Sequence, residues 1–290
     1  MELVKYDIPW RQGASKPFYL SFLGDIQWSG KGGPTAKETL KRHIDRCVEL
    51  GAWYVGMGDY IDFMSPSNRQ RMRAAALYDT AEDVIDEKAM DLVHELWDLV
   101  LKPTKGKWIG LAEGHHFAQL KDGTTTDMRL CEMLGTRFLG TSALVRLQFD
   151  LQNTRGNLVL WVHHGTGGGG KACTPLNKLE NLAPYWGGVD IFLQGHSTKM
   201  PVVPINRVEA RWHGRGAPDL VHRKIYFVNT GGFCKAYRVA SKQGRVPRGD
   251  YAEQGMMNPS VIGAPLIRIV PGSTWKNRSR AWSPEVTVEV

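Results

Sequence analysis

The sequence lacks the features that mark several classes of protein. Its 290 residues contain no run of 18 apolar residues, so we expect no membrane-spanning helix and no membrane partner. The opening stretch MELVKYDIPWRQGASKPF carries charges and proline where a signal peptide would be apolar. Neither an internal repeat nor a low-complexity tract interrupts the chain. We therefore expect one globular domain over residues 1–290.

Cysteine is scarce and scattered. The four cysteines are Cys47, Cys131, Cys173 and Cys234, and no two are spaced as a CxxC pair. This spacing argues against a zinc site built from cysteines. Cys47 and Cys131 fall in segments with a helical pattern, so we expect them to be buried thiols. Such cysteine usage is typical of a reducing compartment, which predicts a cytoplasmic location.

Positive charge exceeds negative charge by 8. This balance favours anionic partners, nucleic acid among them. The basic residues cluster at RQRMR (69–73), RVEARWHGRG (207–216) and WKNRSR (275–280). A solvated basic surface explains each cluster equally well, so charge alone does not select a ligand.

Apolar runs and amphipathic segments alternate between residues 17 and 195. Strands are expected at 17–25, 52–59, 107–114, 142–152, 156–165 and 189–196, and helices at 35–51, 80–101, 125–135 and 174–187. Gly51 is expected to end the first helix and Thr80 to cap the second. This alternation predicts βαβ units and a mostly parallel sheet. A metal-site core of about 18–200 precedes a β-rich part, 201–290, with strands near 224–233, 264–272 and 283–290.

Carboxylates and imidazoles stand at the ends of five expected strands. They are Asp25, Asp59, the pair His115-His116, the pair His163-His164, and His196. One such histidine alone is more often an ordinary hydrogen-bonded residue. In parallel α/β sheets, however, ligands gather beyond the carboxyl ends of the strands. Since carboxylates and imidazoles are metal ligands, the joint pattern predicts a metal site.

The same residues lie in five motifs: GDIQ (24–27), GDYID (58–62), EGHHF (113–117), HHG (163–165) and GHST (195–198). In this order they resemble the signature blocks of the calcineurin-like metallophosphoesterases, which are GDxH, GDxxD, GNH[DE], a histidine beside glycine, and GHxH. Later segments, FVNTGGFCKAY (227–237) and YAEQGM (251–256), resemble phage-type members. The resemblance implies an α/β fold, a four-layer αββα sandwich of two mixed sheets flanked by helices, with the active site at strand C-terminal ends.

The resemblance also implies a role for each matching residue. Asp25 would bind the first metal, and Asp59 would bridge two metals and serve catalysis. His116 would contact the phosphate and protonate the leaving group. The remaining implied ligands are His115, at the family's asparagine position, His164 and His196, and His163 would be a neighbour or a further ligand.

Three residues depart from the family pattern, and two of them, Gln27 and Thr198, fall at positions that serve the first metal site in the family. Gln27 and Thr198 replace histidines, and His115 replaces asparagine. The first site would then hold Asp25 and Asp59 with the Gln27 amide and the Thr198 hydroxyl, an all-oxygen set suited to Mn²⁺ or Mg²⁺. Asp62 could assist this site or act as a helix-start carboxylate.

The second metal site is predicted to be the stronger one. Asp59, His115, His164 and His196 would offer three imidazoles and a carboxylate, which suit Zn²⁺, Fe or Mn²⁺. We expect this site to fill first. The predicted cofactor is one or two divalent ions, with Mn²⁺ favoured.

The stretch GTGGGGKA (165–172) is close to a phosphate-binding P-loop. Ala172 replaces the hydroxyl that would hold Mg²⁺, and the preceding histidines have no place in that motif. A nucleotide-hydrolysing P-loop is therefore disfavoured. We expect Gly167, Gly168 and Lys171 to bind a substrate phosphate through backbone N–H groups and the ammonium. A plain surface loop is the alternative.

The expected function is hydrolysis of a phosphoester by a metal-activated water. Basic charge, ten tryptophans and the phage-type resemblance favour a phosphodiesterase, with DNA or RNA as candidate substrates. Trp28 and Trp186 are candidates for base stacking. A phosphomonoester or a cyclic nucleotide stays open. The alternative is a binding or scaffold protein that keeps the fold but has lost catalytic power, as Gln27 and Thr198 would suggest.

Overall fold

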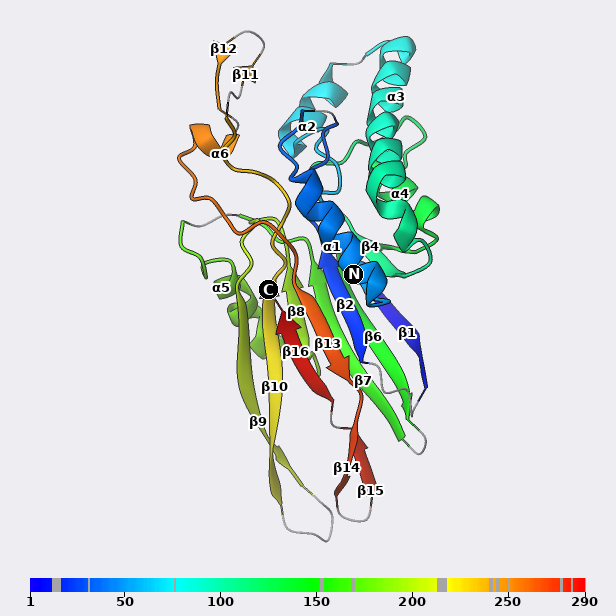
Figure 1. The fold of residues 1–290 in the computed structure, drawn as a ribbon, viewed down its shortest axis with the longest axis vertical. Coiled ribbons are helices and arrows are strands. Elements are labelled where there is room, and N and C mark those ends of the chain that lie inside the picture. The colour runs from blue at the N-terminus through cyan, green and yellow to red at the C-terminus, as the bar shows by residue number, and fades with distance from the viewer. Residues whose placement is uncertain are drawn as a thin grey trace.

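The computed structural model describes the chain except for residues 12–16, 31, 76, 152–153, 168–169, 213–217, 240–241, 244–245, 250, 277–278, 283 and 290. Most of the described strands belong to two six-stranded sheets (Figure 1). The first sheet has the order β16-β13-β2-β3-β4-β5. Its strands are β16 (Glu285–Glu289), β13 (Leu266–Val270), β2 (Phe18–Leu23), β3 (Trp53–Gly56), β4 (Trp108–Ala112) and β5 (Phe138–Gly140).

Parallel pairing joins β2, β3, β4 and β5, whereas β13 is antiparallel to both β2 and β16. The second sheet has the order β1-β6-β7-β8-β10-β9. Its strands are β1 (Glu2–Arg11), β6 (Ser142–Leu151), β7 (Thr154–His163), β8 (Ile191–Gln194), β10 (Asp219–Asn229) and β9 (Val202–Arg211). Here β7, β8 and β10 run parallel, whereas β6 is antiparallel to β7 and β9 is antiparallel to β10, so both sheets are mixed.

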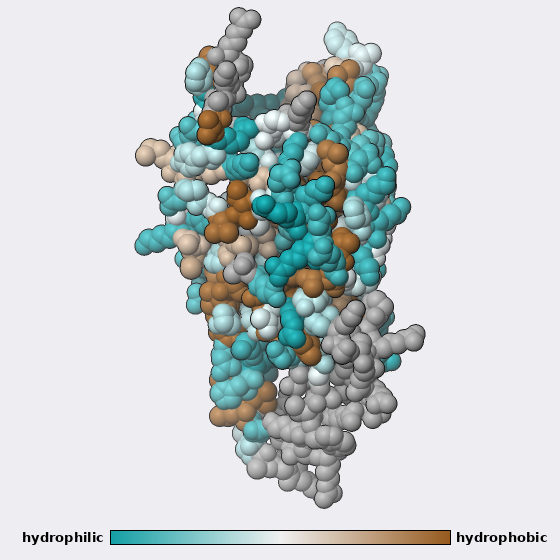
Figure 2. Space-filling model, in the orientation of Figure 1, coloured by the Kyte–Doolittle hydropathy of each residue, from teal (hydrophilic) through white to brown (hydrophobic). Residues whose placement is uncertain are grey.

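Helices cover the outer faces of the two sheets. The helices α1 (Lys37–Glu49), α3 (Asp79–Leu96) and α4 (Thr126–Leu134) share a buried cluster with the first sheet. The short helix α5 (Leu176–Leu182) packs with the second sheet. A third apolar cluster, which includes Val55, Val145 and Leu193, lies between the sheets. The predicted four-layer αββα sandwich is confirmed, and Figure 2 shows mainly hydrophilic residues over α1 and α3.

Three expected features match the structure well. The first helix ends at Glu49, and Gly51 follows with a φ of +66°, a left-handed conformation that glycine adopts without strain. The two strands expected at 142–165 form the antiparallel hairpin β6–β7. Cys47 and Cys131 are buried, as predicted.

Other features differ from the sequence prediction. The helix α3 starts at Asp79 with Tyr78 as its cap, so Thr80 is not the N-cap. The strand β1 was not predicted, and it lies along β6 with Val4 and Ile8 as its buried residues. The helix α2 (Pro66–Ala74) was also missed, because it buries no side chain and thus has no apolar stripe.

The described chain also contains a π-helical turn at Trp97–Leu101, 3₁₀ turns at Lys102–Thr104 and Ala183–Tyr185, two short ribbons and one short helix. The ribbon β11 (Lys242–Gln243) with β12 (Val246–Pro247) and the helix α6 (Tyr251–Gln254) follow β10. The ribbon β14 (Ser273–Lys276) with β15 (Ser279–Trp282) precedes β16. Among the described residues, no helix has the length and apolar character needed to cross a membrane.

His43 links α1 to the first sheet and should make stability depend on pH. Its Nε2 lies 2.8 Å from the Ser21 hydroxyl, and burial, with help from the charge of Arg46, lowers the pKa of His43 from 6.5 to about 4. The folded state therefore favours the neutral ring, while the unfolded chain takes up a proton first as pH falls. Stability is fully present above pH 6.5 and declines toward pH 4.

We predict that His43→Gln reduces this loss. Between pH 7 and pH 5 the wild type should lose about 2 kcal/mol more of its unfolding free energy than the variant. Urea unfolding of both proteins at the two pH values measures the difference. The same loss in both proteins would show that His43 does not carry the effect.

Candidate metal centre

Five strand ends from both sheets bring five side chains to one place. Asp25, Asp59 and His115 follow β2, β3 and β4, while His164 and His196 follow β7 and β8. One ligand atom from each of His115, His164 and His196 lies within 4.8 Å of the other two, and the same is true of Asp25, Asp59 and His164. His164 belongs to both groups. The metal cluster, as we call these five residues, could therefore hold a divalent cation.

The backbone around the metal cluster adopts an uncommon conformation. Six non-glycine residues of the described chain have positive φ, and five of them belong to these strand ends: Asp25 (48°), Gln27 (49°), Asp59 (53°), His196 (69°) and Thr198 (53°). Left-handed backbone costs a non-glycine residue about 1–3 kcal/mol. Such strain persists where the surroundings enforce it, and it concentrates at functional sites.

Two glycines let the strand ends approach each other closely. A Cβ atom on Gly114 would lie 2.0 Å from the Asp59 backbone nitrogen, a distance that no real Cβ tolerates. A Cβ atom on Gly58, which has a φ of +92°, would lie 2.6 Å from His164 Nδ1. Each glycine therefore makes room for a member of the metal cluster.

Asp59 is held in place by backbone hydrogen bonds and by a contact with an imidazole. Its Oδ1 accepts hydrogen bonds from the backbone N–H groups of His115 and His116, the latter at 3.0 Å. Its Oδ2 lies 3.2 Å from His164 Nε2. Burial opposes ionisation, but these bonds and the neighbouring imidazoles outweigh it and hold the pKa of Asp59 well below its usual range. Asp59 is therefore a carboxylate.

Asp25 and His164 each expose an unsatisfied polar atom to the metal cluster. Asp25 is fully buried, and its Oδ2 accepts from His196 N–H at 2.7 Å while Oδ1 has no hydrogen-bond partner. Burial, supported by the charge of Asp59, raises the pKa of Asp25 to about 7. The Nδ1 of His164 lies 2.6 Å from the Met57 carbonyl, which can only accept, so Nδ1 carries a hydrogen.

That bond orients His164 for ligation. Nε2 is the buried nitrogen that faces Asp59 Oδ2, and a cation would bind there by displacing the proton that the ring carries without a metal. Burial would lower the pKa of His164, but Asp59 and Asp25 outweigh it and raise the pKa to about 9. A hydrogen bond that fixes the second nitrogen is the usual arrangement for a metal-binding histidine.

His115 and His196 complete the set of imidazoles. Their Nδ1 atoms are 3.2 Å apart, and burial lowers the pKa of both rings, that of His196 to about 4. Both rings are therefore neutral, the form that binds metals. Unpartnered buried oxygen and nitrogen atoms beside neutral imidazoles fit a divalent cation in this position.

The grouping of ligands differs from the expected division into two sites. His164 joins Asp25 and Asp59 in the carboxylate group, where Gln27 and Thr198 were expected. The backbone N–H of Gln27 donates to the Asp59 carbonyl, and its own carbonyl accepts from the Thr35 hydroxyl. Asp25 and Thr198 both lie close to Gly232, where a Cβ would be 2.7 Å from Asp25 Cβ and 3.3 Å from Thr198 Cγ2. Ligation by either side chain stays a prediction.

His163 and Asp62 lie beside the metal cluster. His163 stacks on Trp161 with the rings 5.6 Å apart, and its Nδ1 accepts from the Gly165 N–H at 2.7 Å. Asp62 Oδ1 lies 2.8 Å from His116 Nδ1. Asp62 does not start a helix, since the next helix begins at Pro66 with Ser65 as its cap.

The glycine-rich loop is only partly described. Gly168 lies outside the described residues, whereas Gly167 has a φ of +71° and Lys171 is exposed. The Lys178 ammonium donates to the carbonyl and the hydroxyl of Thr166 at 2.6 and 2.7 Å. Phosphate binding by Gly167, Gly168 and Lys171 stays a prediction.

The base-stacking expectation is wrong for Trp28. This side chain is 1% exposed within the core of the first sheet, with the Lys37 ammonium 4.3 Å from its ring centroid. Trp186 is partly buried and packs on the cluster under α5. Because Trp28 is buried, it has no exposed ring face on which a base could stack.

Two residues near the metal cluster were missed in the sequence. Asp127, buried on α4, accepts from the Gly114 N–H at 3.0 Å, and burial raises its pKa to about 7. Thr230 is buried and its hydroxyl has no partner. A Cβ on Gly195 would lie 2.8 Å from Asp25 Oδ2 and 3.2 Å from Thr230 Oγ1. Gly231 and Gly232 follow Thr230 at the end of a strand, and this pattern in the sequence could have identified Thr230 as a candidate.

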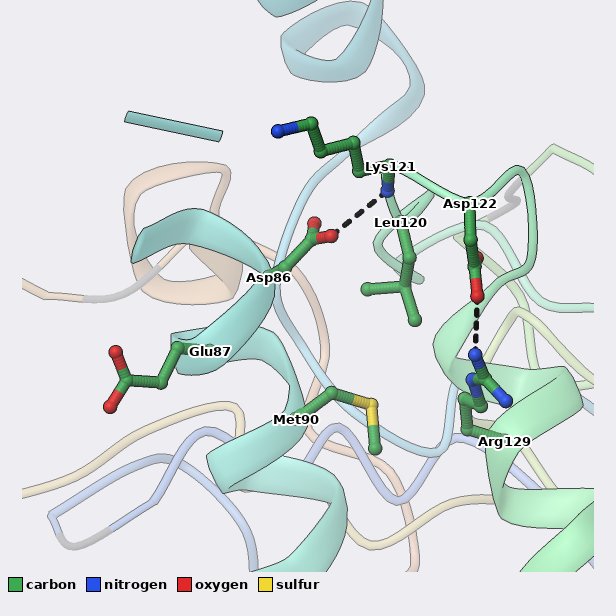
Figure 3. A pocket seen from close by; sticks show the side chains of 7 residues that line it. All are labelled: Asp86, Glu87, Met90, Leu120, Lys121, Asp122 and Arg129. Atoms are coloured by element: carbon green, nitrogen blue, oxygen red, sulfur yellow. Dashed lines mark hydrogen bonds and ion pairs between the residues drawn. The ribbon is translucent and has the colours of Figure 1, made fainter. Parts of the chain in front are cut away.

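A hollow of about 470 Å³ lies elsewhere, on the helical layer (Figure 3). Its lining comes from α3, α4 and the loop between β4 and α4, and includes Asp86, Lys121 and Arg129. These side chains pair locally: Asp86 accepts from the Lys121 N–H at 2.9 Å, and Arg129 bonds to Asp122. No member of the metal cluster lines this hollow.

Comparison with known proteins gives a distant structural similarity and no match in sequence. No protein-family model and no curated protein matches the chain. Among solved structures, it is similar to Vacuolar Protein Sorting 29 from Cryptosporidium parvum, with 10% sequence identity and a TM-score of 0.32 over 94% of this chain and 100% of that chain. A similarity this distant says nothing about what the chain binds.

We predict that Mn²⁺ stabilises the protein through His164. At a concentration 100 times its Kd, a ligand of the folded state adds about 2.7 kcal/mol to the unfolding free energy. Since His164 belongs to both ligand groups, His164→Ala should abolish this gain, whereas His163→Ala, the matched control, should keep it. Urea unfolding with and without Mn²⁺ measures both. An equal gain in the two variants would contradict the assignment.

Proposed function

We propose that this protein is a calcineurin-like metallophosphoesterase of the phage type, a metal-dependent hydrolase whose preferred substrate is a phosphodiester. The observation that carries the proposal is the convergence of Asp25, Asp59, His115, His164 and His196 within one cluster. The proposed cofactor is one or two divalent ions, with Mn²⁺ favoured, and the proposed location is the cytoplasm. The whole chain, 1–290, is proposed to form the catalytic unit.

The metal cluster would supply the electrostatic part of the reaction. A divalent cation bound there would provide Lewis acidity, which offsets charge on the phosphoryl oxygens and makes a water molecule more acidic. The residues contribute fixed geometry, because Asp59 is tied to the His115 and His116 backbone and Asp25 to the His196 backbone. This rigidity lowers the reorganisation needed during the reaction.

His116 is proposed to protonate the leaving oxygen. Asp62 Oδ1 accepts from its Nδ1–H, and this bond, the largest effect, raises the pKa of His116. The opposite ring nitrogen, Nε2, lies 3.9 Å from Asp59 Oδ2 and so faces the metal cluster. A proton held on Nε2 would thus stand on the side where the phosphoester binds, and Asp62 would stabilise the charged ring.

The competing proposal is a catalytically impaired scaffold. Glutamine at Gln27 and threonine at Thr198 favour it, since the family has imidazoles at both positions. The Asp62–His116 pair favours the enzyme, because binding alone does not need an imidazole held as an acid. A hydrolysis screen distinguishes the enzyme from the scaffold. Its substrates are a chromogenic bis-aryl phosphate, monoesters, DNA and RNA, each with added Mn²⁺. Absence of hydrolysis across Mn²⁺, Zn²⁺, Fe²⁺ and Mg²⁺ would reject the enzyme.

We predict that His116→Ala slows hydrolysis by ~10²–10⁴-fold for a diester with a poor, alkyl-type leaving group. The loss should be much smaller with a nitrophenyl leaving group, which departs without protonation. Steady-state kcat for both substrates measures the contrast, and Mn²⁺ affinity, measured by calorimetry, serves as the control for intact metal binding. Equal losses for the two leaving groups would exclude His116 as the proton donor.

A further inference from the structure

The helix α2 is an exposed basic helix. Its nine residues, PSNRQRMRA, include Arg69, Arg71 and Arg73 and no acidic residue. None of its residues is buried, and the Ser65 hydroxyl caps its first turn by accepting from the Asn68 N–H. A helix without a buried face adds little to the core. Its exposed side chains, Arg71 and Arg73 among them, are therefore available for a surface role.

Arg69 attaches α2 to the loop that carries His115. Its Nη1 donates to the carbonyls of Met64 (2.7 Å), His115 (2.6 Å) and Phe117 (3.1 Å). The guanidinium also lies 3.8 Å from the centroid of the Phe117 ring. These contacts fix the first turn of α2 against the loop that carries His115, a member of the metal cluster.

Arg71 and Arg73 continue the positive charge of α2 beyond Arg69. At 1.5 Å per helical residue, they lie about 3 and 6 Å further along the axis than Arg69. Both are exposed, and no ion pair to either of them is found within the described part of the chain. Their charges are consequently open to an external anion.

Cations also lie on the other side of the metal cluster. His115 and Asp59 come from the first sheet, and His164 and His196 come from the second. Lys178 bonds to Thr166, two residues after His164, and Lys171 is exposed on the same loop. Positive charge therefore flanks the metal cluster on both the α2 side and the glycine-loop side.

We propose that the substrate is a nucleic-acid strand whose phosphodiester backbone crosses the metal cluster and continues along α2. This inference rests on the proposed hydrolase function. A monoester or a cyclic nucleotide has one phosphate for the cluster and leaves Arg71 and Arg73 unused. A nucleic-acid strand carries a charge about every 3.4 Å, so neighbouring phosphates reach cations beyond the cluster. The flanking cations thus favour a polymer over a small ester.

Binding of a labelled single-stranded 20-mer, measured by fluorescence anisotropy in EDTA across a range of salt concentrations, tests the proposal without metal. Arg71→Gln/Arg73→Gln removes two charges and keeps helix propensity. Lys105→Gln/Lys107→Gln, at the opposite end of β4, is the matched control. The α2 variant should bind about tenfold more weakly, with a log–log salt slope smaller by about 1.4. The control should match the wild type.

Two further arms separate this proposal from the function it rests on. A duplex of the same sequence shows whether one strand or two is bound. Hydrolysis of a bis-aryl phosphate with Mn²⁺ should fall far less in the α2 variant than strand affinity does. If that diester is hydrolysed but the α2 variant binds the oligonucleotide like the control, the strand proposal is overturned and the hydrolase stands. If oligonucleotide binding depends on α2 but no ester is hydrolysed, the hydrolase is rejected instead.

Discussion

The close approach of two buried carboxylates, Asp25 and Asp59, is the constraint around which this structure is arranged. Burial raises the pKa of Asp25 to about 7, and the charge of Asp59 adds to the effect. Backbone N–H groups and the His164 imidazole offset part of this cost. Asp25 Oδ1 remains without a hydrogen-bond partner, and His164 Nε2 has only its contact with Asp59. A divalent cation would satisfy these atoms and the carboxylate charge together.

Other features of the fold serve this arrangement. Glycine at Gly58 and Gly114 lets neighbouring strand ends approach within distances that a side chain would forbid. Left-handed backbone at Asp25 and Asp59 turns the chain sharply where each strand ends. The apolar layer between the sheets fixes the strand ends of one sheet relative to those of the other. It therefore gives the left-handed backbone at these strand ends a rigid support.

Much of the fold and of the cluster could be predicted from the sequence. Gly-Asp and Gly-His pairs after apolar runs are local signals, and they mark Asp25, Asp59 and His196 directly. The sharing of His164 between both ligand groups could not be predicted, because it depends on how the two sheets face each other. The pairing of Asp62 with His116 is likewise a long-range contact. The helix α2 was not predicted because it buries no side chain and so has no apolar pattern. The prediction that Trp28 stacks on a base was wrong because the sequence does not show that this side chain is buried.

Anomalous diffraction from crystals grown with Mn²⁺ tests the central claim most directly. The account predicts a manganese peak within bonding distance of His164 and of at least two other members of the metal cluster. A peak bound by residues outside the cluster, or no peak at saturating Mn²⁺, would contradict it.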